Sequence, residues 1–334
     1  MKLWELLWRS DLKEKFVIQK FLCHFLWCSR EELWLDMDKE LSDECIQKVL
    51  VAYKSYVEDK KPLEFILGHV DFFCREFFVN EATLIPRPET EYMITATTEY
   101  IQSQENSSKN NLLLDIGTGC GVLWISVLLQ NPDYFSEVIF SDYFENALDV
   151  AKKNYETYKG EILAANSDLK VEFFQSDLLK FLNDGTIERL NDKSSTLKGT
   201  SSFAPKGISF GQIKEDSNIV LVANLPYIPE EMFEANAADN VKKFEPKPAF
   251  VGGADWLDYY RTMFDQLLDI RHKYQDIRQK QESLTTWYLI PITMFLEMMT
   301  WQVDILRQEF GDRMEFEEVK TFHFNIRIVK SWLK

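Results

Sequence analysis

The segment Asn224-Leu225-Pro226-Tyr227 carries the side chains of this chain that are best suited to chemistry. It follows the apolar, β-branched run 219–223, which is typical of a buried parallel strand. Ligands of open α/β sheets bind at the carboxyl ends of the strands, so we expect the segment to face a ligand. An ordinary turn after a strand would also explain these residues, because four-residue motifs recur by chance.

These residue types suit a flat group that carries an amide or amine nitrogen. The side-chain oxygen of Asn224 and the backbone carbonyl of Leu225 can each accept one N–H bond from such a group. Tyr227 can stack on its π face, and Pro226 fixes the φ angle that makes these groups converge. Accepting both N–H bonds draws the nitrogen lone pair out of conjugation and directs it at an electrophile. We therefore predict that Asn224, Pro226 and Tyr227 promote alkylation of a nitrogen without a strong base.

A second motif lies about 100 residues earlier, where the apolar run 112–116 is followed by Gly117-Thr118-Gly119-Cys120-Gly121. This pattern predicts a strand, a glycine-rich turn and the start of a helix. The glycines allow the backbone to approach a ligand closely. The spacing is not G-x-G-x-x-G, so the turn does not specifically indicate a pyrophosphate.

Acidic residues end three successive predicted strands. Asp115 suits a cationic group that bears an amino acid, and Asp142, 23 residues after Gly119, suits a carboxylate that binds ribose hydroxyls. Asp177 is placed to bind an adenine amine. With Asn224 ending a fourth strand, these acids predict a site for S-adenosylmethionine. The alternative is a doubly wound domain in which the acids are merely caps.

The predicted elements indicate an α/β fold. From residue 112 onward strands and helices alternate, which is typical of a parallel sheet, and two antiparallel strands follow in the tail. We expect strands at 112–116, 138–142, 171–177, 218–224, about 292–297, 314–319 and 323–329, and helices at 121–129, 144–158 and 255–272. We expect these elements to form one domain, the methyltransferase domain, over residues 92–334. Its polar segment 183–218 has too few apolar residues for a core and is expected to be a flexible insert.

The N-terminal third has a different organisation. Residues 1–61 are expected to form a small helical domain for substrate docking, with a capping box that begins at Ser29 and a further helix start at Ser42. Residues 62–91 are expected to form a connector that contains an aromatic hairpin. The two prolines that flank Arg87 make the end of the connector stiff and extended. Glu89 or Thr90 could cap the helix that follows.

Composition limits the classes of partner. The net charge of −16 and the pI near 4.8 argue against stable binding to nucleic acid, which needs clustered Lys and Arg. The five cysteines include no C-x-x-C pair and no zinc spacing, so we expect no metal and a reducing compartment. The charged N-terminus does not match a signal peptide, and no apolar stretch is long enough for a membrane span. We expect a cytoplasmic protein, and a monomer.

Several stretches resemble the release-factor glutamine methyltransferases, the HemK/PrmC family. The most specific is Ile85-Pro86-Arg87-Pro88-Glu89-Thr90-Glu91, because generic methyltransferases lack it. The other matching stretches are 62–84, 115–121, 224–228, 245–253, Tyr260-Arg261 and Glu297. The resemblance covers about residues 62–334.

The resemblance implies a Rossmann-like, class I S-adenosylmethionine-dependent methyltransferase with a seven-stranded mixed sheet. It implies methyl transfer to N5 of the glutamine in the Gly-Gly-Gln loop of a peptide-chain release factor. Under this resemblance the cofactor is held by Gly117, Thr118, Gly119, Cys120, Gly121, Asp142 and Leu178. The glutamine is held by Asn224, Leu225, Pro226, Tyr227 and Ile228, and Arg87 and Glu89 lie on the substrate side.

The chain departs from the family pattern at Leu225, where the family usually has proline, at Leu178, where it often has a bulky aromatic, and in the length of the 183–218 insert. Asn-Leu-Pro-Tyr also resembles the motif of ribosomal-RNA adenine dimethyltransferases, so N6-adenine methylation of RNA or DNA is the alternative. The acidic charge and the 62–91 connector count against it. A non-catalytic cofactor-binding protein would require a degraded Asn224 site, which the sequence does not have.

Overall fold

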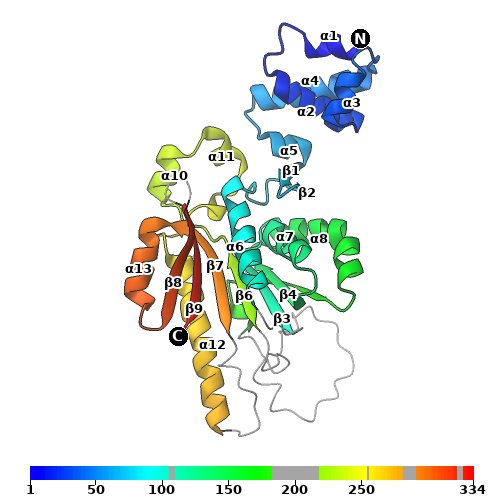
Figure 1. Ribbon diagram of the computed structural model, residues 1–334. Helices are drawn as coiled ribbons and strands as arrows, with labels where there is room; N and C mark the ends of the chain where they lie inside the picture. Colours follow the sequence, from blue (N-terminus) through cyan, green and yellow to red (C-terminus); the bar gives the residue numbers. More distant parts are fainter. Residues whose placement is uncertain (105–109, 183–217, 254–255, 281–290, 322–325) are drawn as a thin grey trace, which may run out of the picture.

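The computed structural model describes residues 1–104, 110–182, 218–253, 256–280, 291–321 and 326–334. A small helical unit at the N-terminus lies at one end of a larger α/β unit (Figure 1). The expected insert 183–218 lies, except for Asn218, outside the described residues. Within the described part of the chain, no helix is both long enough and apolar enough to cross a membrane.

The N-terminal unit consists of short helices around their own apolar core. They are α1 (Leu3–Leu7), α2 (Lys15–Leu26), α3 (Arg30–Leu35), α4 (Asp43–Val57) and α5 (Leu63–Leu67). The capping box at Ser29 is present, and the Ser42 hydroxyl accepts the backbone N–H of Cys45, as the sequence indicates. Leu6, Phe21 and Val49 are fully buried at the centre. Helix α5 was not predicted and lies inside the stretch assigned to the connector.

The expected hairpin follows as the antiparallel pair β1 (His69–Phe72) and β2 (Arg75–Phe78). The Asn154 side chain bonds both the N–H and the C=O of Phe78, so the hairpin is fastened to the larger unit. The short η1 (Pro88–Thr90) then leads into α6 (Glu91–Gln102). Thr90 occupies the N-cap position of this helix, as predicted, but its side chain makes no cap bond there.

A seven-stranded sheet forms the larger unit, in the order β5-β4-β3-β6-β7-β9-β8. Its strands are β3 (Asn111–Ile116), β4 (Phe135–Asp142), β5 (Lys170–Gln175), β6 (Ile219–Ala223), β7 (Ile292–Met299), β8 (Met314–Thr321) and β9 (Ile326–Leu333). Neighbours from β5 to β7 are parallel, and β9 runs antiparallel to both β7 and β8. The predicted α/β fold with a mixed seven-stranded sheet is therefore confirmed.

Helices cover both faces of this sheet (Figure 1). On one face lie α6, α7 (Val122–Gln130) and α8 (Glu145–Ala165), and on the other lie α12 (Asp258–Lys280) and α13 (Thr300–Phe310). Successive residues of β3 explain the two layers, because Leu113 packs with Trp124 of α7 whereas Leu112 and Leu114 pack with the α12 side. The remaining elements are η2 (Lys180–Leu182), α10 (Glu230–Asn236), α11 (Asp239–Phe244) and η4 (Lys247–Ala249).

Element boundaries differ from the predictions in a few places. Helix α8 continues to Ala165 instead of ending at 158, because it buries Ile162 beyond the exposed Gly160. Helix α12 begins at Asp258 instead of 255, and β9 spans 326–333 instead of 323–329. Strand β5 ends at Gln175, so Asp177 lies two residues beyond the strand rather than at its end.

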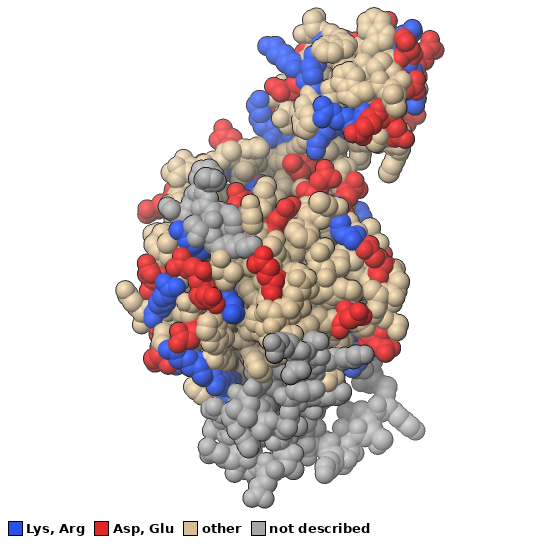
Figure 2. Space-filling view, in the orientation of Figure 1, with Lys and Arg blue, Asp and Glu red and all other residues tan. Residues whose placement is uncertain are grey.

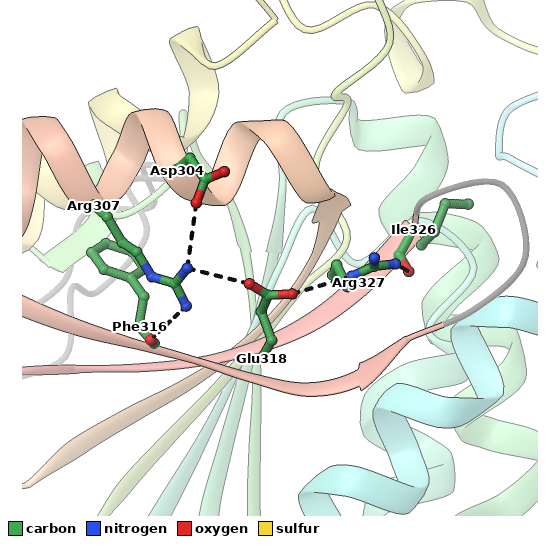
Figure 3. A network of polar contacts seen from close by, with 6 residues as sticks. All are labelled: Asp304, Arg307, Phe316, Glu318, Ile326 and Arg327. Carbon is green, nitrogen blue, oxygen red and sulfur yellow. Dashed lines mark hydrogen bonds and ion pairs between the residues drawn. The ribbon is translucent and has the colours of Figure 1, made fainter.

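The C-terminal hairpin is tied to α13 by a polar network at the side of the sheet (Figure 3). Glu318 of β8 accepts from Arg307 of α13 at 3.2 Å and from Arg327 of β9 at 3.2 Å. Arg307 also donates to the Phe316 carbonyl. Because these groups are partly exposed, the network orients the hairpin more than it stabilises the fold.

Candidate functional site

A cavity of about 450 Å³ lies at the carboxyl ends of the central parallel strands, where an open α/β sheet binds its ligands. Residues from both predicted motifs line it. From the sheet side come Gly117, Thr118, Gly119, Cys120, Asp142, Asp177, Leu178, Asn224, Leu225 and Pro226. The structure therefore brings the glycine-rich turn and the Asn224 segment to one space.

The glycine-rich turn has the backbone conformation that only glycine adopts easily. Gly117, Gly119 and Gly121 have φ angles of 71°, 54° and 84°. A Cβ added at Gly119 would meet no atom within 4 Å, so this residue leaves room for a ligand. A Cβ at Gly117 would approach the Leu225 side chain to 3.0 Å, so the two motifs pack directly on each other. Gly121 caps the start of α7 and does not line the cavity.

Asp142 is the acid that the structure directs at this turn. Its carboxylate accepts the backbone N–H of Gly119 at 2.9 Å and that of Phe144 at 3.0 Å. Burial raises the pKa of the carboxyl, and these N–H bonds oppose the rise. The carboxylate is thus fixed at the cavity wall with lone pairs left for a hydroxyl-bearing ligand.

Asp115 and Asp177 occupy different positions from those predicted. Asp115 is fully buried behind the turn, where it accepts the Thr118 hydroxyl at 2.8 Å, and it does not line the cavity. Burial raises the pKa of Asp115 to about 7. Asp177 lines the cavity and pairs with Lys180, and Leu178 beside it has a φ angle of 55°. Asp115 therefore supports the turn, whereas Asp177 is available to a ligand.

Asn224 lies at the end of β6 with its amide held from one side. Its Nδ2 donates to the Thr90 hydroxyl at 3.2 Å, and Thr90 in turn donates to Glu297 Oε2 at 2.9 Å. Leu225 is almost completely buried, and its side chain packs on the glycine-rich turn. Cys120 is buried beside them, and burial raises the pKa of its thiol to about 12, so it remains a neutral wall residue.

Tyr227 and Ile228 do not line the cavity, in contrast to the prediction that Tyr227 stacks on a ligand there. The Tyr227 hydroxyl donates to Glu297 Oε1 at 2.7 Å, so its side chain is directed into the protein. Ile228 pairs with Val251 through a parallel bridge, and Gln302 donates to the Tyr227 carbonyl at 3.1 Å. These contacts fix the backbone of the Asn224 segment.

Arg87 and Glu89 are also absent from the cavity wall. Arg87 donates to the buried Glu245 at 2.7 Å, and the other oxygen of Glu245 accepts the Ile85 N–H at 3.0 Å. Arg87 instead lines a second cavity, of about 750 Å³, between the helical unit and α11.

Sequence reasoning missed one wall of the main cavity. That wall comes from the connector and from the segment after α11, as Ala82, Thr83, Leu84, Pro86, Thr90, Pro246, Pro248 and Ala249. The clasp between Arg87 and Glu245 joins these two proline-rich segments. Prolines spaced two apart in both segments were the available signal, because such spacing marks stiff extended backbone.

The shape and the hydrogen-bond acceptors of the cavity match the parts of S-adenosylmethionine. An open glycine turn admits a bulky ligand, and Asp142 and Asp177 offer carboxylates for hydroxyl and amine groups. Numbered within the sheet alone, the strand order is 3-2-1-4-5-7-6 with the seventh strand antiparallel. This fold and this site define a class I S-adenosylmethionine-dependent methyltransferase.

Comparison with known proteins identifies the family. The chain is 32% identical over 252 residues to the release factor glutamine methyltransferase of Bacillus anthracis, covering 75% of this chain and 74% of that protein. It is 29% identical over 291 residues to the enzyme of the same name from Streptococcus pneumoniae, covering 86% and 82%. The chain belongs to the release factor glutamine methyltransferase family. No protein-family model matches it.

The solved structures that match the chain share little sequence with it. The E. cuniculi Mtq2-Trm112 complex, described as responsible for methylation of the eRF1 translation termination factor, gives a TM-score of 0.39 at 13% identity, over 76% of this chain and 99% of that chain. The N-terminal domain of human METTL16 gives a TM-score of 0.41 at 13% identity, over 97% of each chain.

Proposed function

We propose that this protein transfers a methyl group from S-adenosylmethionine to N5 of the glutamine in the Gly-Gly-Gln loop of a peptide-chain release factor. Membership of the family supports the reaction class. The observation that carries the proposal is the position of Asn224, whose amide nitrogen is bound by Thr90 while the residue lines the same cavity as the glycine-rich turn. Its carbonyl oxygen is then the group left to orient a substrate amide.

The cofactor is proposed to lie along Gly117–Gly121, with Asp142 on the ribose hydroxyls and Asp177 and Leu178 at the adenine. S-adenosylmethionine supplies an electrophilic methyl group on a sulfonium. Asp115 contributes indirectly, because it holds the Thr118 hydroxyl from behind. The buried Asp142 carboxylate is held by two backbone N–H groups, so it is already oriented before a ligand arrives.

The glutamine amide is proposed to bind through Asn224 Oδ1 and the Leu225 carbonyl. Each accepts one N–H, so the nitrogen presents its lone pair and needs no strong base. Pro226 holds the turn, and Tyr227 acts by anchoring the segment through Glu297 rather than by stacking. Ile228 extends that anchor through its bridge to Val251.

The part of the helical unit within residues 1–61 is proposed to dock the release factor, with residues 62–91 as connector and 92–334 as the catalytic domain. It exposes large apolar side chains, including Trp8, Trp27 and Leu35. The second cavity, lined by Tyr53, Arg87 and residues of α11, lies where a bound protein would contact both units. Glu89, in η1 at the end of the connector, is proposed to contact the substrate as well.

We further propose a cytoplasmic monomer that does not bind nucleic acid stably. The net charge of −16 disfavours contact with phosphates. On the face drawn in Figure 2, the described basic side chains are interspersed with acidic ones instead of forming one continuous basic surface.

The reaction can be tested by offering labelled S-adenosylmethionine and the purified protein to a release factor and, separately, to ribosomal RNA. We expect label on the glutamine of the Gly-Gly-Gln tryptic peptide. Label on adenine of the RNA would instead establish the adenine reaction. Cofactor binding without transfer to either substrate would contradict an enzymatic role.

A further inference from the structure

Glu297 of β7 is a carboxylate buried directly behind the proposed substrate site. Glu297 is only 2% exposed, and each of its two carboxylate oxygens accepts a hydrogen bond from a hydroxyl group. Thr90 donates to Oε2 at 2.9 Å and Tyr227 donates to Oε1 at 2.7 Å. An ionised carboxylate can only accept, so this arrangement fixes the direction of both bonds.

The direction of the Thr90 bond determines which atom of the Asn224 amide Thr90 can bind. Thr90 has one hydroxyl hydrogen, and that hydrogen is directed to Glu297. Toward Asn224 its oxygen can therefore only accept, and it accepts from Nδ2 at 3.2 Å. The amide is held with Nδ2 toward Thr90, which leaves Oδ1 for the cavity.

We propose that Glu297 is a positioning residue that acts through Thr90 to keep the Asn224 carbonyl oxygen facing the substrate. The inference rests on the proposed function for the identity of the substrate group, an amide nitrogen that donates N–H bonds. It assigns Thr90 and Glu297 a role in setting hydrogen-bond polarity, which is separate from any role in packing.

A proton on Glu297 would reverse this polarity. A protonated carboxyl can donate to Thr90, which frees the Thr90 hydrogen to bond Asn224 Oδ1 and turns Nδ2 toward the substrate. Two donors would then face each other. Burial raises the pKa of Glu297, so the carboxyl takes up this proton at a higher pH than an exposed glutamate would. Glu89 adds to this rise, and Tyr260 also faces the carboxyl. The side-chain bonds of Tyr227, Thr90 and, directly, Asn224 oppose the rise.

The test is the pH dependence of kcat for methylation at saturating cofactor and release factor. In the wild type we expect kcat to fall with decreasing pH, with a midpoint above the ordinary glutamate value of about 4.3. Glu297→Gln should lower kcat about 10-fold to 100-fold, less than the about 10²–10³ for outright loss of a preorganised group. It should also remove this acid limb.

Variants of Thr90 separate the relay from packing. Thr90→Val keeps the shape but removes the hydroxyl, so it should lower kcat and weaken the acid limb, whereas Thr90→Ser should retain the limb. The matched control is Thr293→Val on β7, the strand that carries Glu297. It removes a buried hydroxyl that is bonded only to Tyr100 among the described residues. It should keep the wild-type kcat and limb. A wild-type limb in Thr90→Val, or full kcat in Glu297→Gln, would overturn the proposal.

A second measurement does not depend on the substrate. In protein labelled with ¹⁵N-asparagine, the side-chain amide signal of Asn224, assigned by its loss in Asn224→Ala, should shift with the protonation of Glu297. The shift should be reduced in Thr90→Val and absent in Glu297→Gln. An Asn224 signal that does not respond to pH would contradict the relay. If the relay titrates but no release factor is methylated, the proposed function fails while this inference stands.

Discussion

Asn224 and Leu225 are adjacent residues that contribute different atoms to the site. Asn224→Ala removes the proposed acceptor for the substrate amide, so we expect a rate loss of about 10²–10³ with a smaller change in cofactor affinity. Leu225→Pro retains the backbone carbonyl at that position, so we expect only a few-fold change in rate. Single-turnover methylation by both variants at saturating cofactor measures the difference.

The Leu225 variant should also be less stable. The Leu225 side chain is 3% exposed and packs on Gly117, so proline leaves part of that contact empty, at a cost of about 1–2 kcal/mol. If Leu225→Pro lost as much rate as Asn224→Ala, the side chain at 225 would be selecting the substrate.

At this scale, the sequence predicted which residue types meet but not which way each side chain points. Asp142 ends β4, Asn224 follows β6, and both reach the cavity. Asp115 is the last residue but one of β3. Because successive residues of a strand face opposite sides, its carboxylate points to the Thr118 hydroxyl behind the turn instead of into the cavity. Tyr227 was assigned a stacking role, yet its hydroxyl finds a buried carboxylate that lies 70 residues away in the chain. Such partners cannot be read from local spacing.

At the scale of elements, the stretch 250–252 is one of the segments that hold the Asn224 segment in position. Gly252 lies so close to it that an added Cβ would be 2.4 Å from the Pro226 carbonyl oxygen and 2.7 Å from that of Trp256. Gly252→Ala must therefore push the two segments apart, and we expect a loss of about 1–3 kcal/mol together with reduced activity. Denaturant unfolding and cofactor titration measure the two effects.

Gly160 provides the matched control for that variant. It lies within α8, and an added Cβ there meets nothing within 4 Å. Gly160→Ala should therefore stabilise the protein by about 0.5–1 kcal/mol, because alanine is the better helix former. Equal effects of the two substitutions would mean that the contact between 252 and Pro226 does not limit stability.

The elements themselves were largely predictable, because apolar runs and helical spacing are local signals. The strands of the parallel sheet and the hairpin were expected within a few residues of their observed bounds. Helix α5 was missed because five residues between a proline and a glycine give too short a pattern. The wall made by Pro246 and Pro248 was missed because it forms only through the long-range clasp between Arg87 and Glu245.

For the molecule as a whole, the helical unit and the α/β unit have separate apolar cores. The buried residues of the helical core lie between Leu3 and Ala52, whereas Phe65 of α5 packs in the core of the α/β unit. We therefore expect a chain lacking residues 1–61 to keep its cofactor affinity but to lose most activity on an intact release factor. Activity on a short Gly-Gly-Gln peptide should remain, because the peptide does not need the docking surface.

Calorimetry for the cofactor and steady-state kinetics on both substrates test this prediction. A raised KM for the intact factor with an unchanged peptide rate is the expected pattern. A parallel loss of cofactor affinity would show that the helical unit serves the stability of the fold instead.

The clasp and the relay behind Asn224 also determine when the site comes into existence during folding. Thr90 meets Glu297 across 207 residues of sequence, and Ile85 meets Glu245 across 160. A chain still emerging from the ribosome cannot form the first contact until β7 has been made, so partly folded forms have no complete cavity. A ligand of that cavity consequently binds the native state alone. At 100 times its Kd it would add about 2.7 kcal/mol to the free energy of unfolding.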